Sequence, residues 1–148
     1  MSVSVSVQAE DFDVGVEVRA LSLPGVGAVA SFVGRVRESQ SGLVAMTLEH
    51  YPGMTERALH DIAVEAQARW PLAAVRIVHR VGRLLPGEQI VFVGVSGPHR
   101  GEAFAACEFV MDYLKTRAPF WKKEEDANGA HWVDARETDD TAAARWQR

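Results

Sequence analysis

The sequence DYLKTRAPFWKKE, residues 112–124, carries the chain from the end of a helical pattern into a basic and aromatic segment. Pro119 cannot continue a helix, because it lacks an N–H donor and pushes the residue before it toward extended backbone. We therefore expect Lys115 on the last helical turn and Lys122 on a separate segment that folds back. Cationic side chains gathered around such an aromatic elbow suit an anionic ligand better than they suit a core.

A second interpretation of this stretch stays open. Lys115 near a helix C-terminus is favoured by the helix dipole whatever its function. Residues 122–126 are all charged and are predicted to form a polar loop, for which Phe120 and Trp121 can serve as simple hydrophobic anchors. The spacing alone does not separate a binding site from an ordinary solvated loop.

Hydrophobic periodicity predicts the elements around this stretch. Residues 90–95 are continuously apolar, which is typical of a central strand buried on both faces. Residues 27–37 and 43–51 are predicted to form a long hairpin around a polar loop. Thr55 is predicted to be the N-cap of a helix that ends at Trp70. Further predicted elements are strands at 3–7, 75–81 and 131–136, a short helix within 11–21 and a helix at 102–115.

The order of these elements predicts an α+β fold. A mixed, mostly antiparallel sheet is expected to carry two main helices in a hammerhead-like arrangement. Hairpin-length connections argue against a doubly wound parallel sheet. With 148 residues, the chain is expected to form a single domain, 1–148. Residues 141–148 are predicted to form a short helix or a frayed tail, and 137–148 are the candidate for a flexible tail.

The composition is that of an ordinary globular protein, with 47% hydrophobic and 24% charged residues. A formal net charge of −4 argues against a general nucleic-acid binder. The longest apolar run, Ile90 to Val95, is too short to span a membrane, and the first residues lack the pattern of a signal peptide. Cys107 is the lone cysteine, which fits a reducing compartment and reads as a small buried residue. We therefore expect a cytoplasmic protein that binds neither nucleic acid nor membrane.

Basic residues lie at the ends of several predicted elements, where functional side chains are common. His99 and Arg100 precede a helix whose first backbone amides can bind an anion, although a surface loop with incidental charges is the alternative. Taken together, such groups in an acidic protein favour a phosphate or carboxylate pocket. The groups are Arg35 with Arg37, His99 with Arg100, Lys115 with Arg117, Lys122 and Lys123, and Arg136.

Other chemical motifs are missing from the sequence. It contains no glycine-rich dinucleotide fingerprint, no P-loop and no nucleophile elbow. The five histidines show no metal-ligand spacing, and His79 is predicted to be a packed or half-exposed strand residue. We expect no metal and no cofactor.

Three segments together closely resemble the large, catalytic subunit of molybdopterin synthase. They are LEHYPGMT at 48–55, the segment at 94–100 that ends in His99-Arg100, and MDYLKTRAPFWK at 111–122. The resemblance extends from about Gly27 to Arg136 and is most specific at 115–122. Gly97-Pro98 departs from the family pattern, which leaves the geometry of the loop before His99 open.

The resemblance implies a sulfurtransferase that converts cyclic pyranopterin monophosphate to molybdopterin by installing a dithiolene. The sulfur arrives as a thiocarboxylate on the C-terminal Gly-Gly tail of a small ubiquitin-like subunit. The large subunit forms a homodimer, and each copy receives one such tail, giving a heterotetramer. The resemblance also suggests that Arg136 or the loop at His99-Arg100 completes the pocket of the neighbouring copy.

The resemblance also implies site residues, at the positions of this sequence that match the family's motifs. Lys115 and Lys122 match the two active-site lysines, with Lys115 the candidate to neutralise the thiocarboxylate and assist proton transfer. Lys122 is the candidate for a covalent or electrostatic role beside the pterin. The implied substrate-binding residues are Arg35, Val36, Arg37, His99, Arg100, Lys115, Lys122, Lys123, Glu124 and Arg136.

Two other functions are weighed against this one. A non-catalytic adaptor would use the same basic pocket to bind the acidic C-terminal tail of a ubiquitin-like protein. An unrelated phosphotransfer or nucleotide-binding enzyme is the third hypothesis, and the missing phosphate motifs argue against it.

Overall fold

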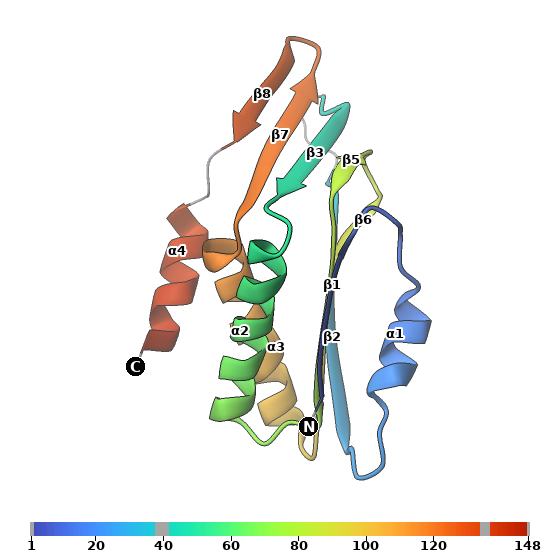
Figure 1. Ribbon diagram of the computed structural model, residues 1–148, viewed down its shortest axis with the longest axis vertical. Coiled ribbons are helices and arrows are strands. Elements are labelled where there is room, and N and C mark those ends of the chain that lie inside the picture. The colour runs from blue at the N-terminus through green and yellow to red at the C-terminus, as the bar shows by residue number, and fades with distance from the viewer. Residues whose placement is uncertain (1, 38–41, 134–136, 148) are drawn as a thin grey trace.

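Two four-stranded sheets organise the chain, and the second continues beyond one end of the first (Figure 1). The computed structural model describes residues 2–37, 42–133 and 137–147. The strands are β1 (Ser2–Gln8), β2 (Ala28–Arg35), β3 (Ala45–His50), β4 (Ala74–Arg80), β5 (Gly82–Leu84), β6 (Gln89–Gly97), β7 (Phe120–Asp126) and β8 (Gly129–Val133). The helices are α1 (Val14–Leu21), α2 (Met54–Arg69), α3 (Arg100–Arg117) and α4 (Glu137–Ala144), followed by a 3-10 turn at Arg145–Gln147.

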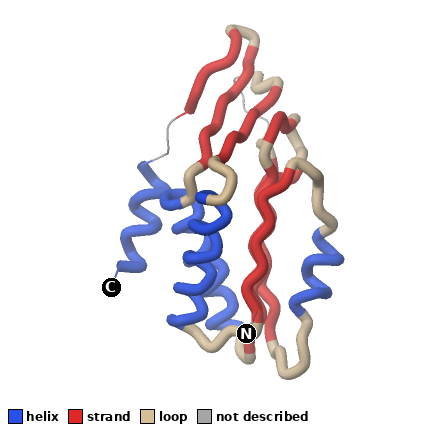
Figure 2. The backbone as a smooth tube through the Cα atoms, viewed as in Figure 1, coloured by secondary structure: helices blue, strands red, loops and turns tan. Residues whose placement is uncertain are grey.

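The first sheet has the order β1-β4-β6-β2 and is covered by helices on both faces (Figure 2). β1 and β4 are parallel, and the other pairs are antiparallel. β6 is central and buried on both faces, as its continuous apolar sequence predicts. Val91, Val93 and Val95 pack in the core under α2 and α3, whereas Phe92 packs with Leu21 of α1.

The second sheet has the order β5-β3-β7-β8, and all its pairs are antiparallel. A small core of Val36, Met46, Leu48 and Leu84 lies on one of its faces. The α+β class and the mixed, mostly antiparallel pairing are confirmed. The strands divide between two sheets, and the second sheet has its own small core, to which β3 contributes Met46 and Leu48 and β5 contributes Leu84.

The predicted hairpin of 27–37 and 43–51 is wrong. β2 pairs with β6 in the first sheet, whereas β3 pairs with β5 and β7 in the second. The register of β2 shifts between Gly34 and Arg35, and the chain then leaves the first sheet. Alternating side chains fix which face of a strand is buried but not which strand becomes its neighbour.

The polar loop predicted at 122–126 is also wrong, because these residues form most of β7. Strand β5 was not predicted at all. The apolar signal is weak in both, since the charged side chains of β7 are only partly buried and pair across the sheet. The last strand ends at Val133, and the remainder of the predicted strand, 134–136, lies outside the described residues.

Thr55 is not the N-cap of α2. The helix begins at Met54 after Gly53, whose φ of 86° suits glycine, and the Glu56 carboxylate accepts a hydrogen bond from the Gly53 N–H at 3.0 Å. The buried Thr55 hydroxyl instead donates to the carbonyl oxygen of Pro119 at 3.1 Å and accepts from the Tyr51 N–H. Thr55 therefore ties the start of α2 to the proline that ends α3.

The end of the chain contains more helix than the sequence predicts. α4 begins at Glu137, and the 3-10 turn brings Trp146 against Trp70 and Phe109. The indole N–H of Trp146 donates to the Asp112 carboxylate at 2.6 Å. Among the described residues, no helix is both long and apolar enough to cross a membrane.

Candidate active site

Residues 118–121, here called the elbow, connect the end of α3 to the start of β7. Ala118 is extended (φ −79°, ψ 129°), as the following proline requires, and the Phe120 N–H donates to the Ala118 carbonyl at 2.9 Å. The Thr55 hydroxyl holds the Pro119 carbonyl. Lys115 lies in the last turn of α3, and Lys122 lies on the strand that follows the elbow, as predicted.

The ring of Phe120 stacks on the imidazole of His79 at the end of β4. Their centroids are 3.8 Å apart and their planes differ by 19°. His79 is buried, and its Nδ1 lies 2.8 Å from the Arg80 carbonyl oxygen. The pKa of His79 is lowered to about 4, chiefly by burial and in smaller part by Lys115 and His50, against the opposing effect of the hydrogen bond to Arg80. Lys115, His50, His79 and Phe120 are therefore neighbours.

Strand alternation decides which side chains of β7 share this neighbourhood. Phe120, Lys122 and Glu124 lie on one face, because successive strand residues point to opposite sides. Lys122 is opposite Leu48, which packs in the small core of the second sheet. The Lys122 ammonium lies 3.8 Å from the Glu124 carboxylate. Lys122 thus shares the inner face with Phe120, two residues from the ring that contacts His79.

The opposite face of β7 carries Trp121 and Lys123. The Trp121 ring contacts Tyr51 edge-on with centroids 4.2 Å apart, and both rings are exposed. The Lys123 ammonium lies 5.4 Å from the centroid of the Trp132 ring on β8, a cation–π contact. The structure therefore separates Lys123 from Lys122, although both were predicted to contact one substrate.

The predicted residues 35–37 lie at the same end of the first sheet as His79. Arg35 donates from Nε and Nη2 to the Gly87 carbonyl, at 3.1 and 2.8 Å, and its strand neighbour is Gln89. The Val36 side chain is buried, and its backbone bonds with Gly87 and Glu88. Arg37 is exposed. Two guanidinium groups thus lie near the upper end of the sheet, while Val36 contributes packing.

His99 and Arg100 lie at the far end of α3. They are exposed at the N-terminus of this 18-residue helix. At about 1.5 Å per residue, Arg100 is roughly 22 Å along the axis from Lys115. Arg136 lies outside the described residues. Within one chain, His99 and Arg100 do not join Lys115 and Lys122 in a single pocket.

The loop before His99 is seated against the start of β2. The Gly27 N–H donates to the Gly97 carbonyl at 3.0 Å, and a Cβ atom on Gly27 would lie 2.2 Å from the Pro98 carbonyl oxygen. Only glycine permits this approach. The Gly97-Pro98 geometry that the sequence leaves open is thus a loop packed tightly on Gly27.

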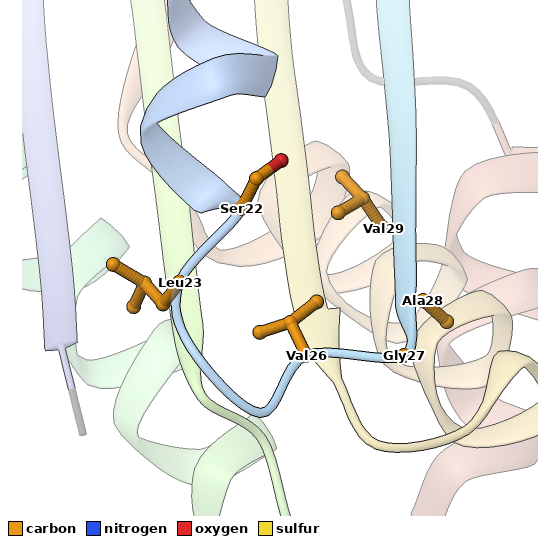
Figure 3. Close-up of a pocket in the computed structure, with 6 residues that line it drawn as sticks. All are labelled: Ser22, Leu23, Val26, Gly27, Ala28 and Val29. Carbon is orange, nitrogen blue, oxygen red and sulfur yellow. The ribbon is translucent and has the colours of Figure 1, made fainter.

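A shallow cavity lies elsewhere, between the end of α1 and the start of β2 (Figure 3). Its lining side chains are aliphatic, apart from one hydroxyl group and one glycine, and it contains none of the predicted site residues. Such a surface has no charge with which to hold an anion. The lining residues are Ser22, Leu23, Val26, Gly27, Ala28 and Val29.

Cys107 is buried in the core under α3. Burial raises the pKa of its thiol to about 11, so the thiolate is not formed at neutral pH. This matches the packing role predicted for it. In the part of the chain that the structure describes, no group of histidine, cysteine and carboxylate side chains could hold a metal ion.

Sequence reasoning gave no role to His50 or His79. On β4, His79 follows Val75 and Ile77 in the row of side chains that point into the core. A polar ring in such a row needs a partner, so the alternation of this strand could have marked His79 as a residue with a specific contact. His50 is opposite Phe120 in the register of β3 and β7. This pairing could not be predicted, because most of β7 was predicted to be a loop.

The comparisons with known proteins agree with one another. The family model described as "MoaE protein" matches residues 7–117. The chain is 58% identical over 147 residues to a protein of Ralstonia nicotianae named molybdopterin synthase catalytic subunit, covering 97% of this chain and 84% of that protein. A solved structure of the molybdopterin biosynthesis MoaE protein from Burkholderia ambifaria is 59% identical, with a TM-score of 0.86 and 99% of each chain covered. A structure of molybdopterin synthase from Staphylococcus aureus is 32% identical, with a TM-score of 0.82, covering 87% of this chain and 96% of that one.

Proposed function

The chain belongs to the MoaE protein family, and we propose that the elbow carries the chemistry of a molybdopterin synthase catalytic subunit. The activity is sulfur transfer to cyclic pyranopterin monophosphate, which forms the molybdopterin dithiolene. The donor is the C-terminal thiocarboxylate of a small ubiquitin-like subunit. One observation carries the proposal: Lys122 shares a strand face with Phe120, whose ring lies against His79 beside Lys115.

The two lysines have different surroundings, which fits different roles. Lys115 lies in the last turn of α3 beside the elbow, where its ammonium can neutralise an incoming thiocarboxylate and transfer a proton. Lys122 stands on the inner face of β7 with Glu124 beside it, where it can stabilise negative charge on the pterin or bond to it transiently. No sulfur nucleophile from this chain is required, because the partner's tail supplies the sulfur.

The phosphate of the substrate needs cationic donors held in place. Arg35 is fixed by two hydrogen bonds to Gly87, and Arg37 follows it at the exposed end of the segment. Guanidinium groups can bind phosphate with paired donors. We assign the phosphate to Arg35 and Arg37, with Glu124 setting the position of Lys122. Lys123 contacts substrate only if the bound ligand or partner extends to the outer face.

His99 and Arg100 enter the site from a second copy of the chain. β2 has a strand neighbour on one side only among the described residues, and the exposed rings of Phe32 and Phe104 lie on β2 and on α3, which packs over it. Exposed edges and apolar rings favour association. Antiparallel pairing of β2 with its copy about a twofold axis would put the Arg100 end of one chain beside the Arg35 end of the other.

The partner's tail reaches the lysines past exposed aromatic rings. Glycines allow a tail to pass through a narrow channel. Phe120 and Trp121 point to opposite faces of β7, so Phe120 lies on the face of Lys122, whereas Trp121 with Tyr51 offers an exposed surface on which the tail approaches the elbow. Trp121→Ala is expected to weaken binding of the partner's tail more than it raises the KM for the pterin.

The single domain spans 1–148 in this proposal, and the protein acts in the cytoplasm, where a lone buried thiol such as Cys107 is stable.

The deciding experiment mixes the purified protein with the pyranopterin precursor and the thiocarboxylated partner. A synthase generates the dithiolene pterin, whereas an adaptor binds the partner without forming product. Lys115→Ala is expected to abolish most of the product while the protein still binds the partner. Full dithiolene formation by Lys115→Ala would remove Lys115 from the mechanism.

A further inference from the structure

The end of β4 contains a feature that the proposed chemistry does not use. Val75 and Ile77 point toward α2 and α3 and are fully buried apolar residues, and His79 is the next residue in this row. A polar ring at such a position costs desolvation free energy that an aliphatic side chain would not. Something other than core packing therefore requires an imidazole here.

The hydrogen bonding of His79 defines one form of the ring. A backbone carbonyl only accepts, so the 2.8 Å contact between Nδ1 and the Arg80 carbonyl places the proton on Nδ1. Burial keeps the ring neutral, with a pKa of about 4. The imidazole is consequently an uncharged flat ring, and its hydrogen bond to the Arg80 carbonyl fixes its orientation.

The His79 ring contacts the elbow from the side of the first sheet. The Phe120 ring lies on it almost parallel, 3.8 Å away. Another tertiary tie at the elbow is the hydrogen bond from Thr55 of α2 to the Pro119 carbonyl, and β3 pairs with Phe120 and Trp121. The elbow is thus held by a helix and by both sheets.

We propose that His79 is a positioning residue of this site: its imidazole fixes the Phe120 ring and thereby the placement of Lys122 relative to Lys115. The inference rests on the proposed function for its chemistry, although the positioning itself is a property of the fold. Lys115 precedes the elbow on α3 and Lys122 follows it on β7, so a shift of Phe120 moves one lysine relative to the other. A neutral ring is required, because a cation at this place would repel Lys115.

Two substitutions at His79 distinguish the effect of a flat ring from the effect of filling the space. His79→Phe keeps a flat ring for Phe120 and loses the bond to Arg80, whereas His79→Leu fills the space without a flat face. Val78→Ala is the stability control, because Val78 is buried on the opposite side of β4, in the core against α1. Thermal unfolding of each variant establishes that it is folded at the assay temperature.

The first readout is the single-turnover rate of dithiolene formation at saturating pterin, with KM measured alongside. His79→Leu is expected to lose about tenfold or more in rate, since small misplacements of catalytic groups are costly. We expect His79→Phe and Val78→Ala to stay within about threefold of the unsubstituted protein, with KM for the pterin little changed in all three. A full rate for His79→Leu, or equal losses in His79→Leu and His79→Phe, would overturn the proposal.

The second readout needs no activity. Amide hydrogen exchange at residues 120–122 is expected to accelerate in His79→Leu and to stay protected in His79→Phe and Val78→Ala. Unchanged protection in His79→Leu would also overturn the proposal. If the unsubstituted protein forms no dithiolene, the proposed function fails, and the exchange data still decide whether His79 positions the elbow.

Discussion

At the scale of single residues, the site depends on which way each charge points. Lys115 could be placed from the sequence, because Pro119 ends the helix after it. The face of Lys122 could not, because β7 was read as a loop and alternation was therefore not applied to it. His79 was assigned to packing, which is correct as to burial, but its partner Phe120 is 41 positions away in sequence and no local pattern connects them.

The buried His79 makes stability depend on pH. Its folded pKa of about 4 lies below the ordinary value of 6.5, so the unfolded chain binds more protons between these pH values. This contribution, about 3 kcal/mol, is present above pH 6.5 and is lost as the pH falls toward 4. The charges of Lys115 and His50 act in the same direction. Denaturant unfolding across this range should show the loss, and His79→Phe should remove most of it; identical pH slopes for the two proteins would contradict the account.

The Cys107 thiol should be unreactive in the folded protein. Its pKa of about 11 and its burial leave almost no accessible thiolate at pH 8. An aromatic disulfide reagent should therefore modify it slowly under native conditions and fully in denaturant. Immediate modification of the native protein would show that the core under α3 opens readily.

At the scale of elements, periodic segments could be predicted and their partners could not. Continuous apolar residues identified β6, and helical spacing identified α2 and α3, because both patterns record burial directly. The hairpin prediction failed, since the choice between two sheets is made by the small core around Leu48 and Leu84. Long-range pairing of this kind leaves no signal within either strand.

Gly27 links the elements at the lower end of the fold. In Gly27→Ala the new methyl would collide with the Pro98 carbonyl, so the loop carrying His99 must move. We expect a loss of about 1–3 kcal/mol in unfolding free energy and a raised KM for the pterin. Gly101→Ala is the matched control, because a Cβ there meets no atom within 4 Å. Equal behaviour of the two variants in both measurements would rule out the seating of this loop on Gly27.

At the scale of the whole molecule, one chain carries two half-sites at opposite ends. Lys115 and Arg35 lie at one end of the first sheet, and His99 and Arg100 at the other. The sequence indicated all of these groups as basic element ends and already placed His99-Arg100 and Lys115 at opposite ends of one helix. The position of Arg35 at the Lys115 end follows only from the strand pairing of β2 with β6. In the proposed function, a complete pocket takes His99 and Arg100 from a second copy.

Mixing two inactive variants tests this sharing. In a mixed dimer of Lys115→Ala and Arg100→Ala, one pocket receives both lesions and the other receives neither. Refolding equal amounts together should restore roughly one quarter of the activity, because half of random dimers are mixed and each has one intact pocket. Activity no higher than that of the separate variants would mean that each pocket is built from one chain.

Strand alternation places Lys122 on the face of β7 that carries Phe120 and places its neighbour Lys123 on the other face, so we expect Lys122 alone of the two to act with Lys115. The most direct measurement is the single-turnover rate of dithiolene formation by Lys122→Ala and Lys123→Ala, two equal truncations one residue apart. We expect a loss of about 100-fold or more for Lys122→Ala and less than about threefold for Lys123→Ala. Equal losses, or the greater loss in Lys123→Ala, would contradict it.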